Sequence, residues 1–242
     1  MPVVYDEKTE RNLGKIHRGT NTPWISPFSS EDGQIEKYDE FSRWKYGILG
    51  TIKPKQIFSG SSKICFINDE NTVFKYIYDL QIFGNQIWKE ILIYKKRAKK
   101  YFDLLPKIFN YGKFWMVEEK VKICSESQFY LMTKIPYKEW EFFICNMNMP
   151  KNSGKLPFNA FLKKEKRRLL KKYKNLDADS DLKRHIKYTN KIFENEILLK
   201  IMEFCYFSGI LICDMHIENI GYKIENGKKV IKILDYGYDG KD

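Results

Sequence analysis

Residues 210–242 read ILICDMHIENIGYKIENGKKVIKILDYGYDGKD, and this stretch decides the fold. Asp214, His216 and Asn219 follow an apolar segment and lie close together in the chain. The next apolar runs, IGYKI and KKVIKIL, read as two strands joined by the tripeptide ENG, whose Asn-Gly pair is a strong hairpin signal. Because a hairpin returns the chain to its starting point, we expect Asp235 to lie near Asn219.

Upstream, the sequence predicts strands, then a helix, then two more strands. Residues 55–78 combine β-branched and aromatic residues with polar turns, which favours three short strands. The run QIWKEILIYKKRAKKYF repeats apolar residues at helical spacing. LLPKIFNYGKFWMVEEKV then reads as two strands around a turn at 110–112. Residues 1–54 are interpreted as an N-terminal extension, and 55–122 as one strand-rich unit.

The remaining residues, 123–242, read as a second, mainly helical unit. Residues 123–145 give only weak signals. Residues 151–192 crowd lysines and arginines together, which predicts a basic helix followed by a polar loop. Residues 194–209 have helical spacing and end at Gly209, as helices often do. The fold class is therefore α+β.

Several residues of the strand-rich unit are candidates for binding a nucleotide. Lys75 lies in the third predicted strand, and Glu90 in the next helix borders the apolar face, so the two are natural ion-pair partners. Glu119 ends the last predicted strand of this unit, and the resemblance named below implies that the backbone there would hydrogen-bond an adenine. The turn between the first two strands would cover phosphates closely, because it consists of the small residues Gly60, Ser61 and Ser62.

These residues together resemble the protein-kinase-like superfamily over roughly residues 55–240, which implies a two-lobe fold with ATP and Mg²⁺ as cofactors. The segment DMHIENI is similar to the D-[LM]-H-x-x-N-I loops of atypical members. These include small bacteriophage-encoded and other viral protein kinases, and the aminoglycoside and choline kinase group. Asp235-Tyr236-Gly237 resembles the D-F-G triplet, with Tyr in place of Phe.

The resemblance also implies a role for each candidate. Asp214 would be the base for the acceptor hydroxyl, and Asn219 and Asp235 would hold Mg²⁺. Lys75, with Glu90, would contact the ATP phosphates. His216 stands where many serine/threonine kinases carry a lysine near the transferred phosphate. The alternative role for His216 is to brace the turn through a hydrogen bond.

Two departures from the kinase pattern matter. Ile212 and Cys213 precede Asp214 in place of His and Arg, so the arginine that reads a phosphorylated activation loop is missing. The chain ends at Asp242, so we expect a minimal C-lobe truncated after the D-Y-G triplet, without peptide-binding helices. The acceptor would then be recognised by the N-terminal extension, the basic 151–192 region or a partner.

Composition narrows the setting and the partners. The net charge of +12 favours anionic partners, namely ATP, a protein substrate or acidic protein, or nucleic acid bound through the Lys163–Lys174 segment. On base rates, that segment is a solvated helix face. Five scattered cysteines without a C-x-x-C pair argue against a disulfide framework or zinc site and favour an intracellular location, in a host cytoplasm or virion. No apolar run is long enough to span a membrane, and the N-terminus does not read as a secretory signal.

The sequence is compatible with three functions. The first is an ATP- and magnesium-dependent serine/threonine protein kinase of viral type, and the second is a small-molecule kinase. The third is an inactive kinase fold that serves as a scaffold or virion protein and binds an acidic partner or nucleic acid. The frequent use of Lys, Asn and Ile fits an AT-rich genome, as in many viruses.

Overall fold

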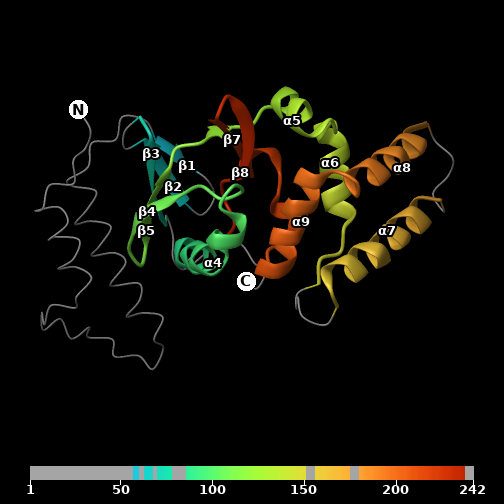
Figure 1. Cartoon of the computed structure of the whole chain (residues 1–242), viewed down its shortest axis with the longest axis horizontal. Coiled ribbons are helices and arrows are strands. Elements are labelled where there is room, and N and C mark those ends of the chain that lie inside the picture. The colour runs from blue at the N-terminus through green and yellow to red at the C-terminus, as the bar shows by residue number, and fades with distance from the viewer. Residues whose placement is uncertain are drawn as a thin grey trace, which may run out of the picture. The chain divides into compact units, whose positions relative to one another are not determined.

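A computed structural model describes residues 57–59, 63–67, 70–77, 86–150, 156–174 and 180–237 (Figure 1). They form two compact units. The first contains the described residues up to Leu92 together with 107–120, and the second contains 93–106 and the described residues from Val121 onward. The predicted N-terminal extension, 1–54, lies outside the described residues. The α+β class is confirmed, and the elements follow the order that the resemblance implied.

The first unit is built on a five-stranded antiparallel sheet with the order β1-β2-β3-β5-β4. The predicted strands are confirmed as β1 (Ile57–Ser59), β2 (Lys63–Ile67), β3 (Thr72–Ile77), β4 (Ile108–Tyr111) and β5 (Trp115–Glu119). The predicted helix is α4 (Gln86–Tyr101). Its Ile87 and Ile91 are fully buried and share one core with Phe74, Ile77 and Met116 of the sheet.

The second unit is mainly helical, and two of its helices lie where the sequence signals were weak. Ser125 begins α5 (Glu126–Thr133) through a capping box with Gln128, which satisfies amide donors at the helix start. Pro136 precedes α6 (Tyr137–Asn146), whose aromatic residues fill the core of this unit. The basic helix is confirmed as α7 (Phe158–Lys174), and α9 (Glu196–Ser208) ends at Gly209 in a left-handed conformation, as predicted.

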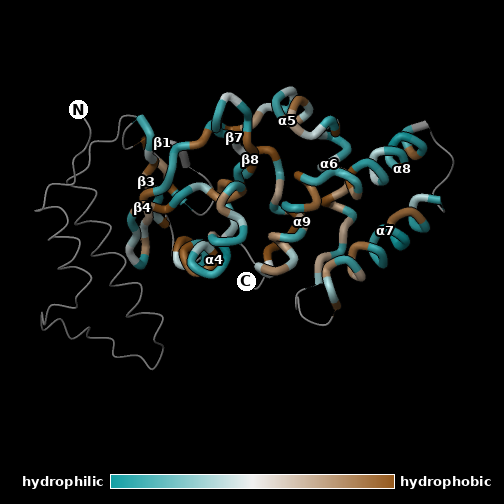
Figure 2. The backbone as a smooth tube through the Cα atoms, viewed as in Figure 1, coloured by the Kyte–Doolittle hydropathy of each residue, from teal (hydrophilic) through white to brown (hydrophobic). Residues whose placement is uncertain are grey.

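The prediction of a polar loop after the basic helix is wrong over residues Ser180–Ile192, because these residues form a further helix, α8. Leu182 and Ile186 recur one turn apart and pack against the core, where Ile192 is fully buried. Figure 2 shows why the composition misleads: α7 and α8 are hydrophilic over much of their length, with only short hydrophobic stretches between. Tertiary packing, more than local hydrophobicity, stabilises this helix.

The predicted C-terminal hairpin is confirmed as β7 (Ile220–Glu225) and β8 (Lys228–Ile233). Its turn places Asn226 and Gly227 at positive φ, which the Asn-Gly pair tolerates well. A short strand, β6 (Lys122–Ile123), adds to β7 opposite Gly221. A Cβ at Gly221 would lie 2.8 Å from the Lys122 carbonyl oxygen, so β6 requires glycine here.

Candidate functional site

The loop between α9 and β7 consists of two short 3-10 turns, η1 (Ile212–Asp214) and η2 (Ile217–Asn219). The Asn219 side chain closes this loop, because its Nδ2 donates a 2.9 Å hydrogen bond to the Asp214 carbonyl oxygen. With the amide nitrogen fixed in this way, Oδ1 points away from that carbonyl and makes no hydrogen bond within the described residues. Asn219 therefore holds the loop through its amide nitrogen, while its role as a metal ligand stays a prediction.

Two aromatic residues of α6, which the sequence did not indicate, hold the loop backbone. Trp140 donates from Nε1 to the Met215 carbonyl oxygen at 2.9 Å. The Tyr137 hydroxyl accepts the Ile217 N–H, also at 2.9 Å. Tyr137 and Trp140 lie three residues apart, so both project from the same face of the helix. Both are buried, and they fix the peptide on either side of His216.

The hairpin brings the chain back to the loop, in agreement with the sequence. Ile220 lies opposite Ile233, and the Leu234 N–H donates to the Asn219 carbonyl oxygen at 2.9 Å. Asp235 follows Leu234 directly, so its backbone starts next to Asn219. Tyr236 is fully buried and packs edge-on against Phe204 of α9, with ring centroids 5.7 Å apart. The buried ring anchors the triplet that carries the Asp235 carboxylate.

His216 lies within this group of polar side chains. Its Nε2 is 3.1 Å from Asn219 Nδ2 and 3.9 Å from an Asp214 carboxylate oxygen. Since Asn219 Nδ2 can only donate, the contact makes His216 Nε2 an acceptor and places the imidazole proton on Nδ1. This geometry fits the bracing role for His216.

The surroundings of Asp214 affect the neighbouring thiols. Burial raises the pKa of Cys213, and the negative charge of Asp214 raises it further. Cys205 on α9 is fully buried, and its pKa is raised for the same two reasons in the same order. Both causes favour the protonated, less reactive form of these thiols near neutral pH.

In the first unit, charged residues form two buried ion pairs, and the predicted pairing of Lys75 with Glu90 stays a prediction. The structure gives the two residues other partners: Lys75 binds Glu118 at 2.5 Å, and Glu90 binds Lys63. All four side chains are buried, with exposures of 7% or less. Lys63 and Glu118 are thus charged residues of this region that the sequence did not indicate.

The register of the sheet explains how these charged residues come together. Lys75 lies opposite Met116 on β5, so Glu118, two residues further along, is a diagonal neighbour on the same face. Lys63 lies opposite Ile77, and Ile77 shares that face of β3 with Lys75. Two lysines and two glutamates therefore compensate one another in a buried group, as isolated buried charges would not.

The other candidates of the first unit have mixed outcomes. Gly60, Ser61 and Ser62 lie outside the described residues. Glu119 ends β5 as expected, but its N–H donates to the Lys107 carbonyl oxygen, and the Lys120 N–H donates to Asn71. Neither N–H group is therefore available to an adenine in this conformation. The next residue, Lys120, is the last residue of this part of the first unit, and Val121 belongs to the second.

The donor set of the loop suits Mg²⁺ bound together with a nucleotide. Among the described residues, no group of three or more His, Cys, Asp or Glu side chains is placed to hold a metal. Mg²⁺ in nucleotide sites takes only one or two protein carboxylates, and phosphates and water complete its coordination. Asp235 and Asn219 are the residues of the loop and hairpin end that would hold such an ion.

Comparisons with known proteins yield a likeness in fold only. No family model matches the chain, and no curated protein matches its sequence. Similar solved structures include APH(2'')-IIa in a ternary complex with streptomycin and ATP, at 15% identity and a TM-score of 0.34 over 82% of this chain and 70% of that chain. The gentamicin complex of APH(2'')-IIa has 15% identity and a TM-score of 0.35 over 86% and 70%, respectively. The ADP-bound aminoglycoside phosphotransferase APH(2'')-Ib has 16% identity and a TM-score of 0.29 over 81% and 70%. At these low scores, we infer function from the residues of this chain alone.

Among the described helices, none is both long enough and apolar enough to cross a bilayer.

Proposed function

We propose that this chain is an ATP- and Mg²⁺-dependent phosphotransferase of the protein-kinase-like type. The observation that carries the proposal is the orientation of Asn219. Its amide nitrogen is bound by the Asp214 carbonyl, which leaves Oδ1 as a ligand at the end of the hairpin where Asp235 begins. An amide oxygen and a carboxylate at one hairpin end, next to a partly exposed Asp214, are the parts that phosphoryl transfer requires.

The side chains of the loop would divide the work. Asp214 would orient the acceptor hydroxyl and accept its proton, because it is the partly exposed carboxylate of the loop. His216 would hold the Asn219 amide in position. Mg²⁺ held by Asn219 Oδ1 and Asp235 would neutralise charge on the phosphates. Lys75 would contact the ATP phosphates, as the resemblance implies.

For the acceptor, we favour a neutral hydroxyl, such as a serine or threonine on a protein, over a polycationic small molecule. A polycation is best bound by clustered carboxylates. The chain, in contrast, is strongly basic, with a net charge of +12. A viral origin remains a prediction from residue usage.

The test is phosphate transfer from labelled ATP, with Mg²⁺, to a mixed protein panel and to kanamycin in parallel. Asp214→Asn and Asp235→Ala should each lower transfer by at least about 100-fold, as expected for loss of an acid-base group or metal ligand. Glu218→Gln is the matched control, because Glu218 is an exposed carboxylate in the same loop. Full activity in Asp214→Asn or Asp235→Ala would contradict the proposal.

The same assay separates the two rival functions. Labelling of kanamycin without labelling of any protein would identify a small-molecule kinase. If neither acceptor is labelled and Mg-ATP does not raise the melting temperature, the chain would be a scaffold, because a ligand that binds the native state must stabilise it.

A further inference from the structure

The positive charge of the chain is concentrated on one helix. Within α7, eight lysines and arginines stand against one glutamate, a net charge of +7, while the whole chain carries +12. Such a density on 17 residues raises the local potential well above that of the average surface. These cations can bind a further partner only if they do not already form ion pairs within the fold.

The inner side of α7 attaches the helix firmly to its unit. Phe161, Leu169 and Tyr173 are spaced eight and four residues apart, which puts them on one side of the helix, and all three are buried in the core. Glu165, on the same side, accepts the Asn148 N–H at 2.6 Å and an Arg168 bond at 2.9 Å. Arg168 also donates to the Asn146 carbonyl oxygen at 2.6 Å. The remaining cations are therefore presented on a rigidly held helix.

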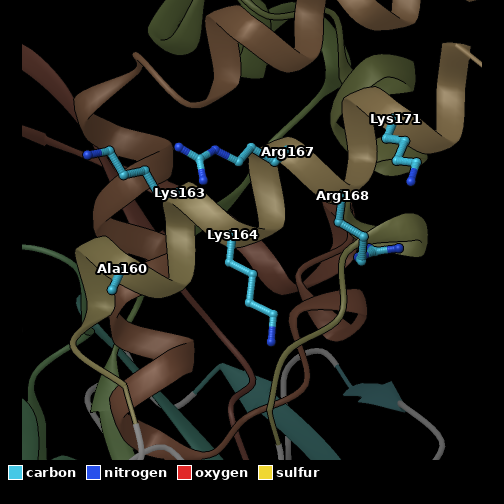
Figure 3. Close-up of a pocket in the computed structure, with 6 residues that line it drawn as sticks. All are labelled: Ala160, Lys163, Lys164, Arg167, Arg168 and Lys171. Carbon is cyan, nitrogen blue, oxygen red and sulfur yellow. The ribbon is translucent and has the colours of Figure 1, made fainter.

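The outer side of α7 forms a continuous basic face. An open hollow of about 460 Å³ lies on it and is lined by α7 alone, as Figure 3 shows: Ala160, Lys163, Lys164, Arg167, Arg168 and Lys171. Four of these, namely Lys163, Lys164, Arg167 and Lys171, are exposed and form no ion pair with the described residues. In Figure 3, Lys163 and Arg167 extend to one side of the helix and Lys164 to the other.

The lining selects the chemical class of ligand. The hollow has the size of a small-molecule pocket, but its six lining residues include no aromatic side chain and five of them are basic. A protein partner would need an apolar interface core, and this face offers only Ala160. Without aromatic residues, it also cannot stack the bases of a single strand. What it can recognise is a row of phosphates.

We propose that the outer face of α7 binds the phosphate backbone of duplex nucleic acid, without reading its sequence. From Lys163 to Lys171 the helix rises about 12 Å, at 1.5 Å per residue, so the four exposed cations form an extended stripe along α7, with Lys163 and Arg167 on one flank and Lys164 on the other. A duplex carries a charge about every 1.7 Å along its axis, dense enough to meet each cation of that stripe. This role goes beyond the proposed phosphotransferase activity and does not depend on it.

The proposal fixes the salt dependence. Four neutralised phosphates give a slope of about −3.6 in a plot of log K against log salt concentration. Binding should therefore weaken by about 150-fold between 50 and 200 mM salt. A contact made through hydrogen bonds to bases would show a smaller slope and a preference among sequences.

The experiment measures fluorescence anisotropy of the full chain with labelled 20-base-pair duplexes of two unrelated sequences, without ATP. The variant K163Q/K164Q/R167Q/K171Q removes the stripe, and K96Q/K99Q/K228Q/K229Q removes the same charge from other exposed positions. We expect the first variant to lose at least about 100-fold in affinity at 50 mM salt and most of the slope. The second should keep both, and the two sequences should bind equally.

Three results would overturn the proposal. One is equal loss of affinity in both quadruple variants, which would mean that net charge alone attracts the duplex. Another is a first variant that binds as the unmodified chain does. The third is polyglutamate of matched charge that binds more tightly than the duplex, which would assign the face to an acidic protein. Circular dichroism melting checks that both variants fold. Because ATP is absent, failure here leaves the phosphotransferase proposal intact.

Discussion

Replacing Tyr137 with phenylalanine tests whether α6 holds the loop of Asp214 in place. The change deletes only the hydroxyl oxygen that accepts the Ile217 N–H at 2.9 Å. The ring stays in its site, where it packs edge-on against Phe129. No cavity larger than an oxygen atom forms, so the effect reports the polar contacts of the hydroxyl, which are the Ile217 hydrogen bond and an interaction with the Glu141 carboxylate.

The size of the effect follows from burial. Tyr137 is 6% exposed, and removing the partner of a buried donor costs about 1–3 kcal/mol. Ile217 is only partly buried, so water can reach its N–H in the variant. We therefore expect about 1 kcal/mol, which lowers the melting temperature of a chain of this size by about 2–4 °C. Phosphate transfer should lose kcat more than KM for ATP, because Asp214 would be displaced while the nucleotide contacts remain.

The measurement is a urea unfolding curve and a thermal melt, compared with Tyr130→Phe as the matched control. Tyr130 lies on α5 with 47% exposure, so the same deletion there should change stability by less than about 0.5 kcal/mol. If Tyr137→Phe and Tyr130→Phe unfold at the same urea concentration, the hydrogen bond to Ile217 does not hold the loop, and the reasoning fails.

Three further predictions concern the two units. Asp214→Asn should speed the alkylation of Cys213 at pH 8, because burial and the Asp214 charge both raise the pKa of that thiol and the variant removes the second cause. The alkylation rate of Cys145, which is also exposed, serves as the internal reference. An unchanged ratio of the Cys213 and Cys145 rates would contradict this prediction. Gly221→Ala should destabilise the chain by about 1–3 kcal/mol in urea, because its Cβ would push against the β6 backbone, and an unaltered midpoint would show that β6 yields at no cost. Glu90→Gln should cost about 3–5 kcal/mol, since it removes a carboxylate from a buried ion pair, whereas a change below about 1 kcal/mol would show that the pair is solvated.

What could be predicted from the sequence was local. Alternating apolar residues and the Asn-Gly turn were enough for the hairpin, and helical spacing with a terminal glycine was enough for α9. The loop of Asp214 could be placed for the same reason, because it lies between two elements with strong local signals. The helix α8 could not, because its stability comes from packing that no short window of sequence contains.

The partners of the charged residues were also out of reach. Lys75 meets Glu118 because β3 and β5 are neighbours in the sheet, and that register is a property of the whole unit. Tyr137 and Trp140 act on residues 80 and 75 positions further along the chain. From the sequence, an aromatic residue in an apolar helix is interpreted as a core residue. Only the fold shows that its hydroxyl or indole N–H also binds the backbone of another loop.

The buried ring of Tyr236 has a consequence for motion. An aromatic side chain of this kind covers about 150–250 Å², so exposing it to water would cost about 4–6 kcal/mol. A conformer with Tyr236 turned outward would then make up less than about one molecule in a thousand. The buried ring therefore holds Asp235 in place. Regulation of this protein must use a mechanism other than an outward rotation of residues 235–237.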